Sequence, residues 1–148
     1  RLRSRGLGDV YKRQGILDLE TGILKLCNAG HNPPILIYPD GQVSYLEFKT
    51  QIFVGVVEDF KYSDEEVVLE KESKLFLYTD GVTEAENINK ELYGEEKLLE
   101  MLSDNASSDV RTTVNVVVDS IASHVKEAEA SDDLTILLIQ YEPGTANS

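Results

Sequence analysis

Short apolar runs bounded by turn residues dominate the first half of the chain. Two pairs of such runs each enclose a turn sequence that contains glycine, and the pairs are 16–19 with 23–26 and 35–38 with 43–46. This arrangement is typical of β-hairpins. A third group follows, in which residues 67–69 precede a turn and the continuous apolar run 75–79. The pattern therefore predicts a series of antiparallel strands.

The apolar spacing changes after Gly81 to the period of a helix. Leucine and methionine at 98–102 predict a short amphipathic helix that begins near Glu95 and Glu96. Valine and isoleucine recur at helical spacing between residues 108 and 126 and predict a long helix, although valine alone would also suit a strand. Residues 134–140 form one more buried strand, and the segment after Tyr141 is polar.

Aspartates lie at the ends of two of the predicted buried strands. Asp80 follows the strand 75–79, whereas Asp132 and Asp133 precede the strand 134–140. If these strands are antiparallel neighbours, the end of one lies beside the start of the other. Clustered carboxylates repel one another unless a cation neutralises them, and hard cations such as Mg²⁺ or Mn²⁺ prefer oxygen ligands. The sequence therefore predicts a carboxylate metal site at this edge of a sheet.

Four ordered motifs resemble those of the SpoIIE/RsbU-type branch of the protein phosphatase 2C family. In chain order they are Asn28-Ala29-Gly30-His31-Asn32-Pro33-Pro34, Tyr78-Thr79-Asp80-Gly81-Val82-Thr83-Glu84-Ala85, Tyr93-Gly94 and Asp132-Asp133-Leu134-Thr135. The resemblance extends from Ile16 to Tyr141. It implies an α+β fold, an antiparallel β-sandwich flanked by helices, of which this chain is expected to be the C-terminal part, truncated at the N-terminus.

The resemblance also implies a reaction and its cofactors. In the family, two divalent cations, Mn²⁺ or Mg²⁺, bridge a water that attacks the phosphorus of phosphoserine or phosphothreonine. Asp80 and Asp132 match the family's metal-ligand aspartates and are the predicted catalytic and metal-binding residues. The alternative for each is an Asx-turn or a helix cap, which are common roles of aspartate.

Three further residues are candidates near this site. Asp133 is either an acceptor that orients metal-bound water or a solvated neighbour. Gly81 is expected to allow a tight turn close to the metal rather than to bind anything itself. His31 either assists acid/base chemistry or contacts substrate phosphate, or it is a turn residue held by backbone hydrogen bonds.

The first fourteen residues are expected to be non-native. Residues 9–14 can be encoded by GAT-GTG-TAT-AAG-AGA-CAG, which resembles the transposase mosaic end of sequencing-library adapters. We therefore predict an adapter-derived segment at 1–14 that packs poorly, a phosphatase-domain segment at 15–141 and a flexible tail at 142–148. Gly8-Asp9-Val10 resembles the start of the family's first metal motif, Gly-Asp-Val-x-Gly-His-Gly, but no Gly-His-Gly follows, so Asp9 is not a predicted ligand.

Charge and composition restrict the partners. The formal net charge is −13, and without the first fourteen residues 9 basic and 26 acidic residues remain, a charge of −17. Nucleic acid and anionic membranes are therefore poor partners. One cysteine, Cys27, excludes an internal disulfide and fits a reducing compartment. We expect a cytoplasmic location, with no direct membrane contact by this segment but with a membrane-anchored sensor domain upstream as an alternative.

The expected function is hydrolysis of phosphoserine or phosphothreonine on bacterial anti-anti-sigma-like regulatory proteins. The alternative is a non-catalytic pseudophosphatase that binds a regulatory partner. Because the aspartate of the first motif bridges the two cations in the family and is expected to be missing here, we predict that the chain alone binds metal weakly and is inactive.

Overall fold

The computed structural model describes residues 12–47, 49, 51, 54, 57, 59–126, 128 and 133–143. Seven strands and three helices lie in this part of the chain, in the order β1 Lys12–Leu17, β2 Ile23–Ala29, β3 Ile35–Ile37, β4 Val43–Tyr45, β5 Glu65–Val68, β6 Lys74–Tyr78, α1 Asp80–Thr83, α2 Glu95–Asp104, α3 Val110–Val125 and β7 Ile136–Gln140. None of the described helices is long and apolar enough to cross a membrane.

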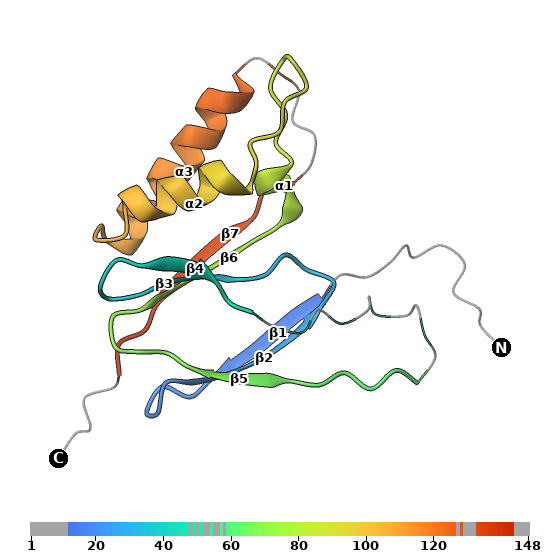
Figure 1. Cartoon of the computed structure of the whole chain (residues 1–148), viewed down its shortest axis with the longest axis vertical. Coiled ribbons are helices and arrows are strands. Elements are labelled where there is room, and N and C mark those ends of the chain that lie inside the picture. Colours follow the sequence, from blue (N-terminus) through green and yellow to red (C-terminus); the bar gives the residue numbers. More distant parts are fainter. Residues whose placement is uncertain are drawn as a thin grey trace.

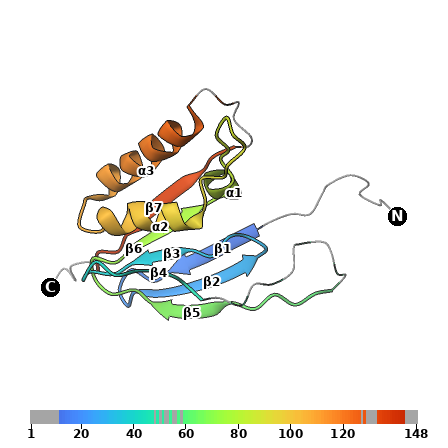
Figure 2. The same ribbon diagram turned by 45° about the horizontal axis from the view of Figure 1, so that its top comes forward.

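The strands form two stacked sheets, and α2 and α3 cover one of them (Figures 1 and 2). The first sheet has the order β1-β2-β5 and the second the order β4-β3-β6-β7. All strand pairs within the two sheets are antiparallel. The predicted α+β fold with an antiparallel β-sandwich and flanking helices is confirmed.

The hairpins and helices lie where the apolar pattern predicts them. The β1–β2 turn includes Gly22, whose φ of 73° is a conformation that glycine adopts at little cost. The long valine-rich segment is the helix α3, so its period outweighed the strand propensity of valine. Asp109 caps the start of α3, because its carboxylate accepts a hydrogen bond from the backbone N–H of Thr112.

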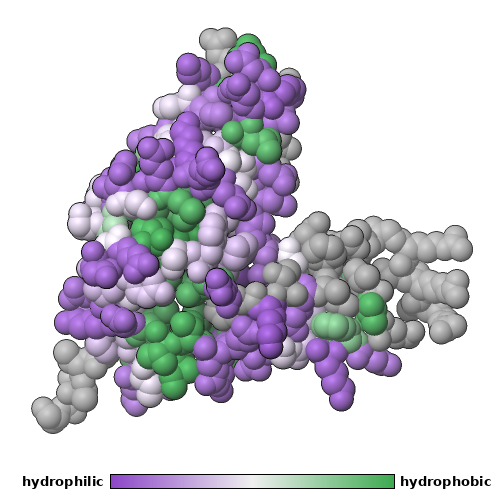
Figure 3. Space-filling model, viewed as in Figure 1, coloured by the Kyte–Doolittle hydropathy of each residue, from purple (hydrophilic) through white to green (hydrophobic). Residues whose placement is uncertain are grey.

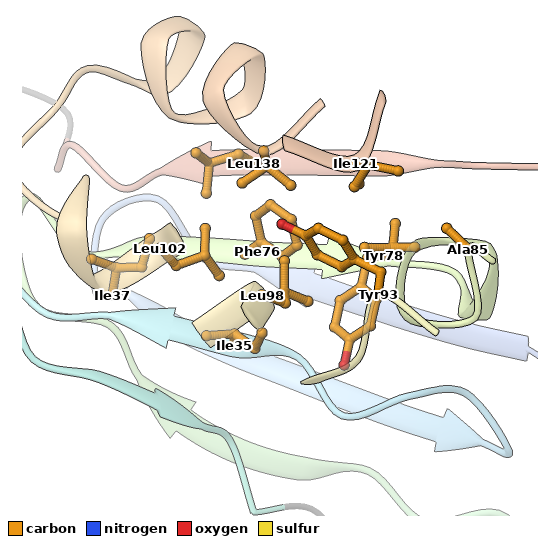
Figure 4. Packing of buried hydrophobic residues seen from close by; sticks show 12 residues of the cluster. Ile35, Ile37, Phe76, Tyr78, Ala85, Tyr93, Leu98, Leu102, Ile121 and Leu138 are labelled. Carbon is orange, nitrogen blue, oxygen red and sulfur yellow. The ribbon is translucent and has the colours of Figure 1, made fainter. Parts of the chain in front are cut away.

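Two apolar clusters fill the spaces between the three layers. The larger cluster lies between the four-stranded sheet and the helices, where Phe76 and Leu138 of the sheet meet Leu98, Leu102 and Ile121 of the helices (Figure 4). The smaller one lies between the two sheets and includes Leu24, Leu26, Leu36, Leu69, Leu75 and Tyr141. The four-stranded sheet therefore contributes residues to both clusters, and the three-stranded sheet contributes to one.

The strand β1 begins inside the segment that was predicted to be non-native. Lys12 is opposite Ala29 and Gln14 is opposite Cys27 in a regular antiparallel register. This regular strand counts against a non-native origin of residues 12–14, although these residues belong to neither apolar cluster, so the adapter-derived segment stays a prediction. Leu2, Leu7 and Tyr11 lie outside the described residues. Backbone hydrogen bonds extend a hairpin with little regard to side-chain identity, so a strand can continue into a foreign sequence.

Candidate active site

The end of β6 and the segment before β7 meet through Thr79. Tyr78 is opposite Ile136 in the sheet, as the antiparallel prediction requires. The backbone N–H of Thr79 donates to the Thr135 carbonyl oxygen at 3.2 Å. Its hydroxyl donates to the Asp133 carbonyl oxygen at 3.2 Å and accepts from the Thr135 N–H at 3.1 Å. These three bonds hold the two aspartate-bearing segments side by side.

Gly81 lies directly against the segment that carries Asp133. A Cβ atom added at Gly81 would be 2.6 Å from the Asp133 carbonyl oxygen and 3.1 Å from the Asp133 carbonyl carbon. Protein atoms do not approach this closely without repulsion, so a side chain here would push the two segments apart. The close contact of the two segments therefore requires glycine at this position.

The predicted aspartates differ in how the structure places them. Asp80 is half-buried at the start of α1, where its Oδ1 accepts a hydrogen bond from the Gly81 N–H at 3.0 Å. Asp133 is exposed, and its backbone adjoins Thr79 and Gly81. Asp132 lies outside the described residues, so its approach to Asp80 stays a prediction.

His31 sits in a turn that the side chain of Asn28 closes. The Asn28 Oδ1 accepts from the His31 N–H at 3.1 Å, and the Asn28 Nδ2 donates to the His31 carbonyl oxygen at 2.8 Å. Burial and the positive charge of Arg13 lower the pKa of His31, and the negative charge of Asp80 partly offsets this. The histidine motif and the Asp80 motif are therefore neighbours. The backbone bonds agree with a structural role for the turn, and the acid/base and phosphate roles stay predictions.

Arg13 is a further charged residue of this region, and it lies within the segment predicted to be non-native. Its guanidinium donates to the Asn32 carbonyl oxygen at 2.7 Å and to the Tyr78 carbonyl oxygen at 3.2 Å. Burial lowers the pKa of Arg13, but an arginine stays charged at neutral pH. Because Arg13 falls within the adapter-like segment, no local signal predicted this placement. In contrast, the Asn28 turn could have been predicted, since asparagine commonly bonds to backbone a few residues away.

The described residues supply only part of a metal-ligand set. Carboxylate oxygens from Asp80 and Asp133 are donors that Mg²⁺ and Mn²⁺ prefer. No group of three or more His, Cys, Asp or Glu residues that could hold a metal ion lies within the described residues. The chemistry of these two carboxylates therefore fits a hard divalent cation.

Comparisons with known proteins identify the family. The sequence model described as Stage II sporulation protein E (SpoIIE) matches residues 14–142. The chain is 27% identical over 125 residues to Protein IcfG of Synechocystis, covering 84% of this chain and 19% of that protein. It is 28% identical over 127 residues to the phosphoserine phosphatase RsbP of Bacillus subtilis, covering 85% of this chain and 29% of that protein. The chain thus spans less than a third of either relative.

Solved structures share the fold at low sequence identity. The RsbU and RsbW domains of Rv1364c from Mycobacterium tuberculosis match with a TM-score of 0.71 and 23% identity, over 91% of this chain and 37% of that one. The phosphatase domain of SpoIIE from Bacillus subtilis, presoaked with Mn, matches with a TM-score of 0.68 and 14% identity, over 91% and 58%. The match therefore includes most of this chain and about half of that domain. From the family match and these shared folds, the chain belongs to the SpoIIE family and has the fold of its protein phosphatase 2C-like domains.

Proposed function

We propose that this chain is part of a metal-dependent protein serine/threonine phosphatase that acts on phosphorylated anti-anti-sigma-like proteins. The observation that carries the proposal is the contact between the Asp80 segment and the Asp133 segment, which Thr79 and Gly81 maintain at the strand ends. Membership of a family that includes a phosphoserine phosphatase supports it. Relatives whose structures involve Mn and magnesium support a divalent cation.

The proposed roles follow from the chemistry of each side chain. Asp80 and Asp132 would be the metal ligands, and Asp133 would accept a hydrogen bond that orients the attacking water. Two divalent cations, Mn²⁺ or Mg²⁺, would supply an activated water and offset the charge that develops on the phosphoryl oxygens. The contacts of Thr79 and Gly81 hold the backbone that carries Asp80 against the backbone of Asp133, which would limit the reorganisation needed when substrate binds.

His31 would act as a neutral ring beside Asp80. Because burial and Arg13 lower its pKa from 6.5, the imidazole is mostly unprotonated at pH 7 and can accept a proton or a hydrogen bond. At a pH between the lowered pKa of His31 in the folded chain and its higher pKa in the unfolded chain, the unfolded chain binds more protons. Protonation of His31 therefore lowers the free energy of unfolding as the pH falls through this range.

A phosphatase assay with Mn²⁺ and a phosphoserine peptide tests the proposal. A protein in which residues 15–148 follow a segment that carries Gly-Asp-Val-x-Gly-His-Gly should release phosphate, and Asp80→Asn should abolish most of this activity because a carboxylate ligand becomes a neutral amide. The matched control is Asp119→Asn, which changes an exposed aspartate on α3 and should leave turnover unchanged.

The same assay separates the enzyme from the non-catalytic alternative. A correctly folded protein that releases no phosphate, or whose turnover is the same in Asp80→Asn, would contradict the proposed activity and favour a pseudophosphatase that binds a partner. Strong Asp80-dependent turnover by the chain from Gly15 onward, without any upstream segment, would instead contradict the expectation that a bridging aspartate is supplied from elsewhere.

A further inference from the structure

A small hairpin that follows α1 exposes two large apolar side chains. Glu86 and Leu92 form its antiparallel bridge, and we call residues 86–92 the 86–92 hairpin. Ile88 is 75% exposed and Leu92 is 53% exposed, so neither packs into the two apolar clusters. In Figure 3, a small hydrophobic surface lies beside hydrophilic surface at the top of the molecule, where this hairpin is. The apolar tip therefore faces water.

The hairpin has a defined shape. The Asn87 N–H donates to the Glu91 carbonyl oxygen at 3.0 Å, and the Asn87 Oδ1 accepts from the N–H groups of Asn89 at 2.8 Å and Glu91 at 3.0 Å. Lys90 forms an ion pair of 2.7 Å with Glu86. Because these bonds fix the turn, Ile88 and Leu92 are presented in one arrangement, and little conformational entropy is lost when a partner binds them.

The hairpin is also fixed relative to Asp80. The Tyr93 N–H donates to the Ala85 carbonyl oxygen at 2.8 Å, and the Gly94 N–H donates to the Thr83 carbonyl oxygen at 2.9 Å, so both arms are tied to the end of α1. On the other side, the His124 Nε2 donates to the Glu91 carbonyl oxygen at 2.9 Å. The hairpin and α1 lie at the same end of the molecule in both ribbon views (Figures 1 and 2). The hairpin therefore extends from the segment that carries Asp80.

We propose that the 86–92 hairpin is a docking surface for the phosphorylated protein, with Ile88 and Leu92 contacting apolar side chains close to the phosphoserine. This inference rests on the proposed function, because only a polypeptide substrate carries residues beyond the reacting phosphate. A small phosphate ester bound at Asp80 has no atoms that extend to the hairpin. The hairpin thus selects among protein substrates and does not take part in the chemistry.

The charges around the hairpin favour an apolar flank over an acidic one. Exposed Glu91 and Glu96 are acidic, while the lysines nearby are already engaged, Lys90 with Glu86 and Lys97 over the ring of Tyr93. A phosphoserine is itself close to doubly negative at pH 7, so a further acidic flank would be repelled. Burial of apolar side chains against Ile88 and Leu92 provides attraction without adding negative charge.

Peptide binding tests this surface, with the same protein as in the phosphatase assay, in which residues 15–148 follow a segment that carries Gly-Asp-Val-x-Gly-His-Gly. The probes are two fluorescein-labelled peptides that carry a non-hydrolysable phosphonate analogue of phosphoserine, one with leucines beside the analogue and one with serines at the same positions. Their binding is measured by fluorescence anisotropy with Mn²⁺. We expect the wild type to prefer the leucine peptide. The double variant Ile88→Ser/Leu92→Ser should bind the leucine peptide about tenfold more weakly, because two apolar contacts are lost, and should bind the serine peptide as the wild type does.

Two matched variants control for nonspecific effects. Ile16→Ser/Val68→Ser alters two equally exposed apolar residues on the three-stranded sheet and should change neither peptide's binding. Ile88→Val/Leu92→Met keeps apolar groups on the hairpin and should keep the leucine preference. Equal thermal midpoints of all variants would show that the fold is retained, as expected for changes at exposed side chains.

Three outcomes would overturn the docking surface. The first is that the wild type binds both peptides equally. The second is that the Ile16→Ser/Val68→Ser variant loses as much affinity for the leucine peptide as the hairpin variant does. The third is a dimer in size-exclusion chromatography that only Ile88→Ser/Leu92→Ser disrupts, because the hairpin would then be a self-association surface. Hydrolysis of p-nitrophenyl phosphate distinguishes failure of the docking surface from failure of the proposed phosphatase activity. If docking is wrong but the phosphatase is right, Asp80→Asn still abolishes that hydrolysis. If the phosphatase is wrong, Asp80→Asn has no effect on it.

Discussion

The two sheets of this domain are built from similar apolar strands but are buried differently. In the four-stranded sheet, β6 is buried along almost its whole length, because helices cover one face and the second sheet covers the other. In the three-stranded sheet, β5 alternates half-buried and exposed residues, and Ile16 and Val68 are 66% and 64% exposed on its outer face. Within the described part of the chain, the four-stranded sheet is therefore more enclosed than the three-stranded sheet, although its edge strand β7 leaves Leu137 50% exposed.

The difference explains where the candidate site lies. Asp80 follows β6, which is packed on both faces, and Asp133 precedes β7, which is held to β6 by a continuous register from Lys74 to Tyr78. A functional group gains precision when its supporting element is rigid. The three-stranded sheet contributes the His31 turn, which follows β2, and depends on fewer packing contacts. We therefore expect changes in the four-stranded sheet to be costly and matched changes in the three-stranded sheet to be tolerated.

The largest expected difference concerns apolar side chains. Phe76 is fully buried in the larger cluster, so Phe76→Ala should lower the free energy of unfolding by about 3–5 kcal/mol through lost contacts and a cavity. Ile16→Ala removes an exposed side chain and should change it by no more than about 0.5 kcal/mol. Urea denaturation of both variants measures this. Similar losses for the two would show that the sheets are equally enclosed.

A smaller difference is expected for lysines in the two sheets. The Lys74 ammonium is buried, which lowers its pKa, and it donates to the carbonyl oxygens of Ala106 at 2.7 Å and Ser108 at 2.5 Å. Lys74→Met should reduce the free energy of unfolding by about 2 kcal/mol, because two carbonyl groups between α2 and α3 lose a charged donor.

The matched variant for Lys74 is Lys25→Met in the three-stranded sheet. Lys25 forms an exposed ion pair of 2.6 Å with Glu66, and water replaces such a partner readily. Denaturation curves should therefore show no measurable change for Lys25→Met. A loss as large as that of Lys74→Met would mean that the outer face of the three-stranded sheet is shielded from water.

The smallest expected difference concerns glycines. Gly81→Ala places a methyl group 2.6 Å from the Asp133 carbonyl oxygen, and rigid backbone cannot easily move aside, so we expect a loss of about 1–2 kcal/mol. Gly15→Ala meets the Leu26 Cδ1 at 2.9 Å, which is the end of a flexible side chain and can move. Amide NMR shifts of Thr79 and Thr135 should change in the first variant and not in the second. Unchanged shifts in Gly81→Ala would refute the tight contact of the two segments.

Sequence alone was sufficient for the elements and for part of the site. Local apolar period located both hairpins and the helices α2 and α3, because periodic burial is a property of each element by itself. The placement of Asp80 after one strand and Asp133 before another, together with antiparallel pairing, was enough to bring the two segments together. The elements follow from local apolar spacing, and the contact of the two segments required in addition only that their strands are neighbours in the sheet.

The tertiary structure decided what depends on contacts between distant segments. The apolar runs of the two sheets look alike in the sequence. The stacking of the layers decides which strands are buried between two layers and which have an outward face. The placement of Arg13 against Tyr78, 65 residues away, arises because β1 extends along β2 through backbone hydrogen bonds that do not depend on side chains. The anchoring of the 86–92 hairpin by His124 is likewise a long-range contact. Local pattern determines elements, and packing between them determines their neighbours.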